Sequence, residues 1–563
     1  MKKKILCLAL CALMILASFV GCAEKSRDEL MNQIGEETSK GAVTLTMYIL
    51  AEEAVSEKQE RLVEDAVNDI IDSYKIKLDL KYYTSDNYYK VLEKNLAEMK
   101  RYYGNKEHLS KETEAPVYTD ENGLPTTYYP PNEEFQVDLF YFGGYDRYKK
   151  YAEAGYLADF TAELSTSASL LKGGISSILY ENVKLVNGKY DMMPVNAEVG
   201  EYTYMLFNKE ILSSTQYKAD QLTSLVGENC ADLLSMVKKY YPDYAPLYSS
   251  EGVLSLNGVK SFGIDEKGFA DNSFSLISGT YNSAWTYGTQ NAYPVMSGID
   301  ATADNGNGTV AEQIKTLKNY EFNGYYKTEE DGDKPFAVGY VKGGLEIVDK
   351  YSSDYEIVVV DTPTLTTEGL YENVMAISSQ TKSLPSSARI LTELYTNKEL
   401  INILANGLEG ENYVWTNSEV LDKNDEPYRV IKKQEKEGYV YKIDPYKMAN
   451  VAAIYSSTND DPARSERILA QNGDAKKDLL LGYSLYGSGV NLTAMNKVTE
   501  YSKDIEAKIL AADSAEKLDE VFAEIEALLA TEDVKAVLAA ENSVYAYYMK
   551  WLTNAKIYVA AAN

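Results

Sequence analysis

Histidine, the residue most often used for acid–base catalysis and metal binding, occurs once in this chain. A Ser-His-Asp or Cys-His arrangement would have to use that residue, His108, and a zinc site would have to be built almost without imidazole. His108 lies in residues 104–135, a stretch rich in Pro, Gly and Glu that is typical of a surface insertion or lid. We therefore expect no catalytic residue, no metal site and no cofactor.

Fragments of enzyme motifs occur without the neighbours that their chemistry needs. Residues 379–382 (SQTK) have the S-x-x-K spacing and residues 85–87 are S-D-N, but they stand in the wrong order and no K-T-G follows. The chain has no GxxxxGK[ST] phosphate loop and no GxSxG nucleophile elbow. Pairs of carboxylates, which suffice for glycoside hydrolysis, are too common here to exclude that reaction.

Tyrosine and the acidic residues are the abundant groups that could recognise a ligand. The chain has 49 Tyr, three Trp and 85 Asp and Glu residues. Sugars present flat C–H faces and edges of hydroxyl groups, so a sugar site needs aromatic rings together with carboxylate or amide acceptors. Tyr145 and Asp146 form one such pair, on a glycine turn directly after the strand-like run at 136–142.

Strands and helices alternate in the part of the chain that leads to this turn. A helix is predicted to begin at Ser56, which with Gln59 has the spacing of a capping box. Such alternation predicts a mostly parallel sheet with helices on both faces, and ligands at the carboxyl ends of its strands. The predicted strands are residues 43–50, 75–83 and 136–142, and helical spacing follows the first two, up to residue 71 and over 88–102.

The first 22 residues have the pattern of a secretory leader. Lys2, Lys3 and Lys4 precede an apolar run that ends at Val20, and Gly21-Cys22 follows. The pattern resembles a bacterial lipoprotein signal, except that Phe19 replaces the usual Leu. We expect 1–21 to be a signal peptide, Cys22 to carry the lipid (palmitate-type acylation), and 22–42 to be a tether. Ordinary cleavage at a nearby small residue is the alternative.

The composition indicates what kind of protein follows the predicted leader. The formal net charge is −29, which argues against a nucleic-acid partner. Hydrophobic residues make up 45% of the chain, enough for a large core, and no apolar stretch after the leader is long enough to span a bilayer. Once Cys7 and Cys11 leave with the leader and Cys22 is lipidated, Cys230 has no disulfide partner. We expect it to be a buried apolar residue.

Four stretches resemble the extracellular solute-binding proteins of ABC importers, in the carbohydrate-binding group (family 1) related to maltose-binding protein. Residues 138–164 (DLFYFGGYDRYKKYAEAGYLADFTAEL) and 186–212 (VNGKYDMMPVNAEVGEYTYMLFNKEIL) carry the first two motifs. Residues 371–415 match the return between lobes, and the helical stretch 498–551 also resembles large lipoproteins of Gram-positive bacteria. The resemblance covers nearly all of residues 43–560.

This resemblance implies an α/β, two-lobe, periplasmic-binding-protein-like (type II) fold with hinge crossings and a helical C-terminal part. The crossings would fall near residues 200–204, 357–363 and 412–417, and the C-terminal helices at 505–530 and 533–551. The implied lobes are residues 43–199 plus 358–411 for lobe one and 200–357 plus 412–563 for lobe two, with 104–135 as an insertion.

The resemblance also suggests which residues contact the ligand. Glu201 lies seven residues before Asn208, as a sugar-binding glutamate does before the "N-K" of maltose-binding protein, and Glu198 is its competitor. Aromatic residues near the implied cleft would be stacking platforms. The candidate ligand-binding residues are Tyr145, Asp146, Glu198, Glu201, Tyr202, Trp285, Tyr287, Tyr413 and Trp415.

The resemblance implies a monomeric receptor, lipid-anchored on the extracytoplasmic face of the cell membrane of a Gram-positive bacterium. It would bind a carbohydrate, an oligosaccharide above all, and deliver it to an ABC permease driven by a separate ATPase, without bond chemistry. Two alternatives stay open, a surface glycoside hydrolase and a peptide-binding ABC receptor.

Overall fold

A computed structural model describes residues 43–103 and 135–554, together with strands β3 (Val117–Thr119) and β4 (Pro125–Thr127). The predicted leader, Cys22, the tether, His108, Trp285 and Tyr287 lie outside the described residues. Further gaps fall at 186–187, 223, 253–262, 265–269, 272–274, 282–293, 299–309, 479 and 486–487.

A five-stranded sheet with the order β2-β1-β5-β16-β6 forms the centre of what we call the first lobe. Strands β1, β2 and β5 are parallel, and β16 runs antiparallel to both β5 and β6. The predicted parallel strands are thus confirmed, with antiparallel β16 added from far along the chain. The strands are β1 (Val43–Ala51), β2 (Ile76–Thr84), β5 (Leu139–Phe142), β6 (Met193–Pro194) and β16 (Val374–Ile377).

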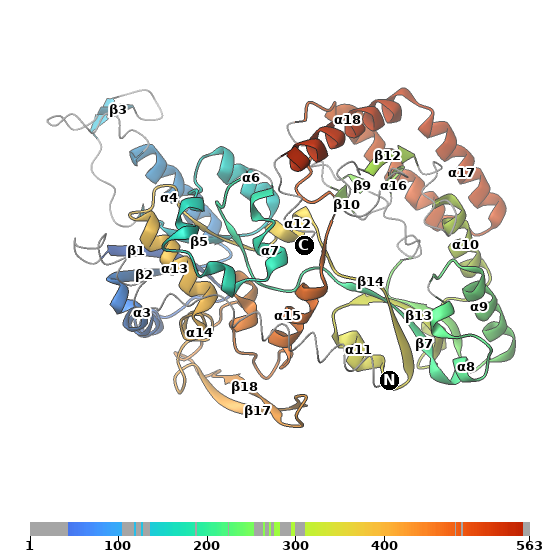
Figure 1. Ribbon diagram of the computed structural model, residues 1–563, viewed down its shortest axis with the longest axis horizontal. Coiled ribbons are helices and arrows are strands. Elements are labelled where there is room, and N and C mark those ends of the chain that lie inside the picture. The colour runs from blue at the N-terminus through green and yellow to red at the C-terminus, as the bar shows by residue number, and fades with distance from the viewer. Residues whose placement is uncertain are drawn as a thin grey trace.

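Helices cover this sheet and bury their apolar faces in one large core. Figure 1 shows them around β1, β2 and β5. They are α3 (Glu57–Ile71), α4 (Tyr88–Tyr103), α6 (Tyr145–Glu153), α7 (Ser177–Tyr180), α12 (Thr367–Tyr371), α13 (Leu384–Thr396) and α14 (Lys398–Asn406).

Helix α3 begins where the sequence predicts, but half of the predicted capping box is not formed. The Ser56 hydroxyl accepts the Gln59 backbone N–H at 3.4 Å, as an N-cap does. The Gln59 side chain instead donates to the Gly438 carbonyl at 3.0 Å and accepts from the Asn412 side-chain amide at 2.7 Å. Gln59 therefore fastens α3 to a segment more than 350 positions away.

Strand β5 begins at Leu139, later than the predicted strand at 136–142, and the buried side chain of Asp138 lies just before it. Its carboxylate accepts the Thr46 backbone N–H at 2.8 Å, and the Lys382 backbone N–H at 2.7 Å. The Thr381 hydroxyl also donates to it at 2.7 Å. These bonds satisfy a buried charge and tie β1 to the turn before α13.

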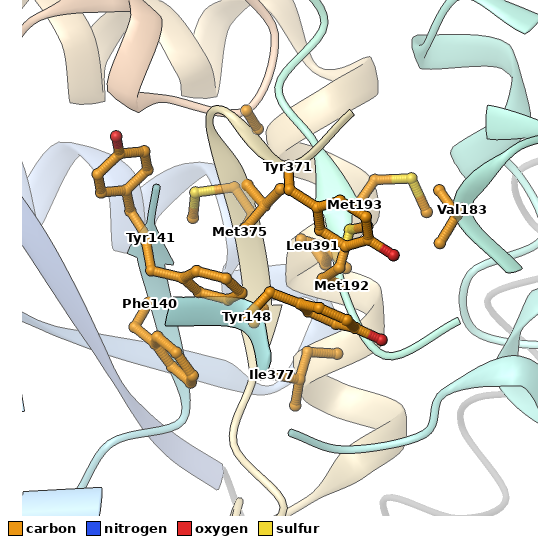
Figure 2. Close-up of a cluster of buried hydrophobic side chains, with 14 of the residues drawn as sticks. Phe140, Tyr141, Tyr148, Val183, Met192, Met193, Tyr371, Met375, Ile377 and Leu391 are labelled. Carbon is orange, nitrogen blue, oxygen red and sulfur yellow. The ribbon is translucent and has the colours of Figure 1, made fainter. Parts of the chain in front are cut away.

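Aromatic and methionine side chains fill the first-lobe core beside β5. Figure 2 shows the rings of Tyr148 and Tyr371 side by side, and their centroids are 4.4 Å apart. Met193 and Met375 come from the neighbouring strands β6 and β16. The core therefore fixes α6 and α12 to each other and to the sheet.

The second lobe is built on a four-stranded mixed sheet with the order β14-β7-β13-β8. Buried Cys230, on α9, packs between this sheet and its helices, and burial raises the pKa of its thiol to about 12, as expected of an inert core residue. The strands are β7 (Tyr202–Asn208), β8 (Ala245–Ser249), β13 (Phe336–Gly343) and β14 (Tyr355–Asp361). The helices are α8 (Lys209–Ser213), α9 (Glu228–Tyr240), α10 (Val310–Phe322) and α11 (Glu346–Tyr351). Two short antiparallel strand pairs also lie in this part of the chain. They are β9 (Gly263–Ile264) with β10 (Ala270–Asp271), and β11 (Ile277–Tyr281) with β12 (Pro294–Gly298).

Three C-terminal helices replace the two that the sequence predicts. They are α16 (Leu492–Ala511), α17 (Ala515–Leu529) and α18 (Glu532–Asn554). The expected helix at 505–530 is interrupted because the Ser514 side chain caps a new helix by accepting the Lys517 backbone N–H. Ile505 of α16 and Ile525 of α17 form an apolar stripe that packs with Ile314 of α10.

Several segments run between the two lobes and meet near α15 (Arg464–Asp474), which lies between them in Figure 1. Strand β15 (Thr364–Leu365) follows β14 and pairs with β19 (Lys476–Lys477), just after α15. The hairpin of β17 (Tyr413–Leu421) and β18 (Pro427–Lys433) lies at the lower edge of the first lobe. The lobe boundaries predicted from the sequence remain a prediction.

Candidate ligand-binding site

The turn after β5 lies at the carboxyl edge of the first-lobe sheet, where the sequence places Tyr145 and Asp146. Gly144 has φ +91°, and its N–H donates to the Tyr371 carbonyl at 2.8 Å. A Cβ on Gly143 would lie 2.7 Å from the Glu372 carbonyl oxygen. The two glycines thus allow α6 and α12 to approach closely at this edge.

A cavity of about 500 Å³ lies beside the glycine turn. Four carboxylates and two basic side chains surround it. They come from α4, from α6, and from α12 and the residue just after it. Such a cavity offers carboxylate acceptors and an aromatic ring to a hydroxyl-rich ligand. Its lining residues are Glu93, Gly143, Gly144, Tyr145, Asp146, Arg147, Lys150, Glu368 and Glu372.

The two basic side chains of the cavity are already engaged. Lys150 pairs with Glu93 at 2.6 Å, and Arg147 donates to the Gly143 carbonyl at 2.7 Å. The Arg147 guanidinium also lies 3.6 Å from the ring centroid of Tyr89. Carboxylates therefore supply most of the charge that a ligand would meet.

The two predicted residues in the cavity differ in their exposure. Tyr145 is buried, and its ring lies edge-on against Tyr371 with centroids 5.0 Å apart. Burial raises the pKa of its hydroxyl above the ordinary value, so this group stays protonated and can donate or accept a hydrogen bond. Asp146 is about half exposed and lies 4.0 Å from Lys149.

A neighbouring segment, residues 441–446, continues the carboxyl edge towards the connections between the lobes. The Glu52 backbone N–H, after β1, donates to the Lys442 carbonyl at 3.1 Å. The Tyr446 hydroxyl donates to Glu198 at 3.3 Å. Burial raises the pKa of Glu198 above its ordinary value. Glu198 thus lies on the same edge, held by a tyrosine that sequence analysis did not single out.

Glu201 and Tyr202 lie on the first connection into the second lobe. Glu201 is exposed, whereas Tyr202 is buried and its hydroxyl donates to Asp474 at 2.8 Å. The Tyr202 ring stacks on Tyr204, with centroids 5.5 Å apart. The contacts of Tyr202 join β7 to the end of α15.

Tyr413 and Trp415 lie on β17, away from the glycine turn in Figure 1. The Trp415 indole N–H donates to Glu409 at 3.2 Å, and the Arg429 guanidinium lies 4.3 Å from its ring centroid. The Tyr455 ring lies edge-on against the Trp415 ring, with the ring centroids 4.6 Å apart. Of the nine candidate residues, the structure brings Tyr145 and Asp146 into one cavity.

No pattern in the sequence marked the other charged residues that line the cavity. Glu93 is on α4, Arg147 is one residue beyond the predicted pair, and Glu372 comes just before β16. Glu372 reaches the cavity through tertiary pairing, because antiparallel β16 sets Val374 opposite Phe142 at the end of β5. In the described part of the chain, no group of three His, Cys, Asp or Glu side chains could hold a metal ion. No helix there is both long and apolar enough to cross a membrane.

The arrangement of the two lobes matches a solved structure over most of its length. The N-glycan transport solute-binding protein of Streptococcus pneumoniae aligns with 90% of this chain and 99% of its own, at 17% identity and a TM-score of 0.51. The chain has the fold of an extracellular solute-binding protein. The predicted two-lobe α/β fold is therefore confirmed.

A second similar structure shares the solute-binding description. The HMO-binding, ABC-transporter-associated solute-binding protein of Bifidobacterium longum infantis covers 92% of this chain and 99% of its own, at 11% identity and a TM-score of 0.46. No family model and no curated protein matches the sequence. The likeness to the Streptococcus pneumoniae protein therefore lies in the tertiary fold.

Proposed function

We propose that this protein is an extracytoplasmic receptor that captures a carbohydrate between its lobes and delivers it to an ABC permease. The observation that carries the proposal is the match of 90% of the chain to the fold of an N-glycan transport receptor. The cavity at the first-lobe edge supports it, because carboxylates and a buried tyrosine suit hydroxyl-rich ligands. The protein itself would perform no bond chemistry.

The experiment that tests this function is a thermal-shift screen followed by calorimetry. The panel contains N-glycan fragments such as Man5GlcNAc, maltose-type oligosaccharides and peptides. A ligand that binds the native state alone raises the melting temperature by mass action, so a sugar hit with no peptide hit is expected. Peptide hits alone, or release of shorter glycans during incubation, would point instead to a peptide receptor or a glycoside hydrolase.

Membrane attachment is a separate part of the proposal. Lipidation of Cys22 would hold the receptor at the outer surface within reach of a permease. The Cys22→Ser protein is expected to move from the detergent phase to the aqueous phase in a detergent-partitioning assay. Cys11→Ser, within the same leader, is the matched control and should stay in the detergent phase. A Cys22→Ser protein that remained with the detergent would contradict the anchor and leave the receptor proposal intact.

A further inference from the structure

Helix α15 contacts the first lobe through one of its faces. Buried Ile468 packs with Val195 and Val451. The Asn472 side chain accepts the Val199 N–H at 2.8 Å and donates to the Ala197 carbonyl at 2.8 Å. These contacts fix α15 to the chain that leads out of the first lobe.

A second face of α15 points at the second lobe. Arg467 Nη2 lies 2.7 Å from the Asp349 carboxylate on α11, and Arg467 Nε lies 2.8 Å from Asp461. The Arg467 side chain is 18% exposed and Asp349 is 70% exposed. One guanidinium therefore holds an acid on α11 and an acid beside its own helix, a geometry that suits the fork of arginine.

The same face continues along the connections between the lobes. Gln471, four residues after Arg467, donates to the Gly200 carbonyl at 2.5 Å. Asp474, seven residues after Arg467, accepts from the Tyr202 hydroxyl. This spacing places the three side chains on one stripe of a helix. Lys476, just beyond the helix, pairs with Asp361 at the end of β14.

Together these contacts join α15 to both connections and to the body of the second lobe. The bonds of Gln471, Asp474 and Lys476 reach Gly200 and the ends of β7 and β14, where the connections enter the second-lobe sheet. The ion pair of Arg467 instead reaches α11, the helix that follows strand β13 of the second-lobe sheet along the chain. The distance between Arg467 and Asp349 would therefore change with the angle between the lobes.

We propose that Arg467 is a positioning residue whose ion pair with Asp349 sets the resting separation of the two lobes. The inference rests on the proposed receptor function, because lobe separation then decides what fraction of molecules is ready to bind. When that fraction falls, the apparent affinity falls in proportion. An ion pair of this partly exposed kind changes such an equilibrium about two- to fivefold.

The test measures the lobe separation directly. Spin labels are placed at Ser169→Cys in the first lobe and Lys239→Cys in the second, both exposed positions, while Cys230 stays buried. Asp349→Asn is expected to give a longer mean distance and a broader distribution than the otherwise unchanged chain. In 1 M salt the parent distribution should move towards that of the variant, because salt screens an exposed pair.

Two matched variants distinguish the effect of breaking the ion pair from the effect of removing one negative charge. Glu57→Gln removes an exposed carboxylate paired with Arg61 inside the first lobe, so it should leave the distances unchanged. Asp349→Glu keeps the carboxylate and should restore most of the parent distribution. Equal distance distributions for the parent chain and Asp349→Asn would overturn the proposal.

Affinity for Man5GlcNAc supplies a second readout. Asp349→Asn should weaken binding about two- to fivefold without a change in the ligand contacts. Unchanged affinity, with the distances shifted, would overturn the link between lobe separation and binding. A parent chain that binds no Man5GlcNAc would count against the proposed function for this glycan, while the distance measurement would still decide the role of Arg467.

Discussion

The Arg147 guanidinium lies over the Tyr89 ring, with 3.6 Å between the Arg147 Cζ atom and the ring centroid. Tyr89 comes from α4 and Arg147 from α6, so the pair fixes the wall of the cavity. Replacing Tyr89 by Leu removes the ring face, whereas Tyr89→Phe keeps it, and both variants lack the hydroxyl. We expect the Leu variant to be less stable than the Phe variant by about 0.5–1 kcal/mol in urea unfolding. Equal stability of the two would show that the stacked pair contributes nothing.

Asp146 tests whether the cavity binds the ligand. Asp146→Asn keeps the size of the side chain and removes the charge that would accept sugar hydroxyl groups. A hydrogen bond to a charged group contributes about 1.5–3 kcal/mol, so we expect affinity for a sugar hit to fall at least about tenfold in calorimetry. Glu153→Gln, at the other end of α6, is the control and should bind normally. Full affinity in the Asp146→Asn protein would place the ligand elsewhere.

Gly200 makes the first connection depend on a conformation that few residues adopt. Its φ is +56°, and a Cβ there would lie 2.9 Å from backbone atoms of Thr364. Gly200→Ala is therefore expected to lower the free energy of unfolding by about 1–3 kcal/mol. At Gly173 an added Cβ meets nothing within 4 Å, so Gly173→Ala is the matched control. Two equally stable variants in chemical denaturation would contradict this account of the hinge.

Glu541 is completely buried in α18, and among the residues that the structure describes neither of its carboxylate oxygens has a hydrogen-bond partner. Burial raises its pKa from the ordinary 4.5 to about 8. The folded state holds the Glu541 proton more tightly than the unfolded state does. The stability that this proton contributes is therefore fully present below about pH 4.5 and is lost as the pH rises towards 8. The slope for one group reaches about 1.4 kcal/mol per pH unit.

Glu541→Gln removes this titration. Relative to the parent chain, the variant should therefore gain stability between pH 5 and pH 8, by more than about 1 kcal/mol in chemical denaturation. Glu526→Gln, at an exposed position on α17, should give the same difference from the parent at both pH values. A stability difference for Glu541→Gln that does not change with pH would contradict the raised pKa.

The sequence predicts local structure well where a short-range pattern controls it. An apolar run marks β1, alternation of apolar and charged residues marks β2, and Ser56 marks the start of α3. The same reasoning fails for the helix expected at 505–530, because the cap formed by Ser514 competes with an apolar stripe that continues across the break. The capping box at Gln59 is wrong in its second half because a distant carbonyl offers a better partner.

The sequence by itself determined the alternating α/β pattern, the glycine turn before Tyr145 and the acidic character of the chain. Only the tertiary structure decided that Glu93, Asp146 and Glu372 share one cavity, and that Arg467 reaches Asp349 across the lobes. The physical reason is range. Periodicity and capping act over a few residues, whereas a binding cavity and a contact between lobes depend on where side chains hundreds of positions apart are brought together by packing.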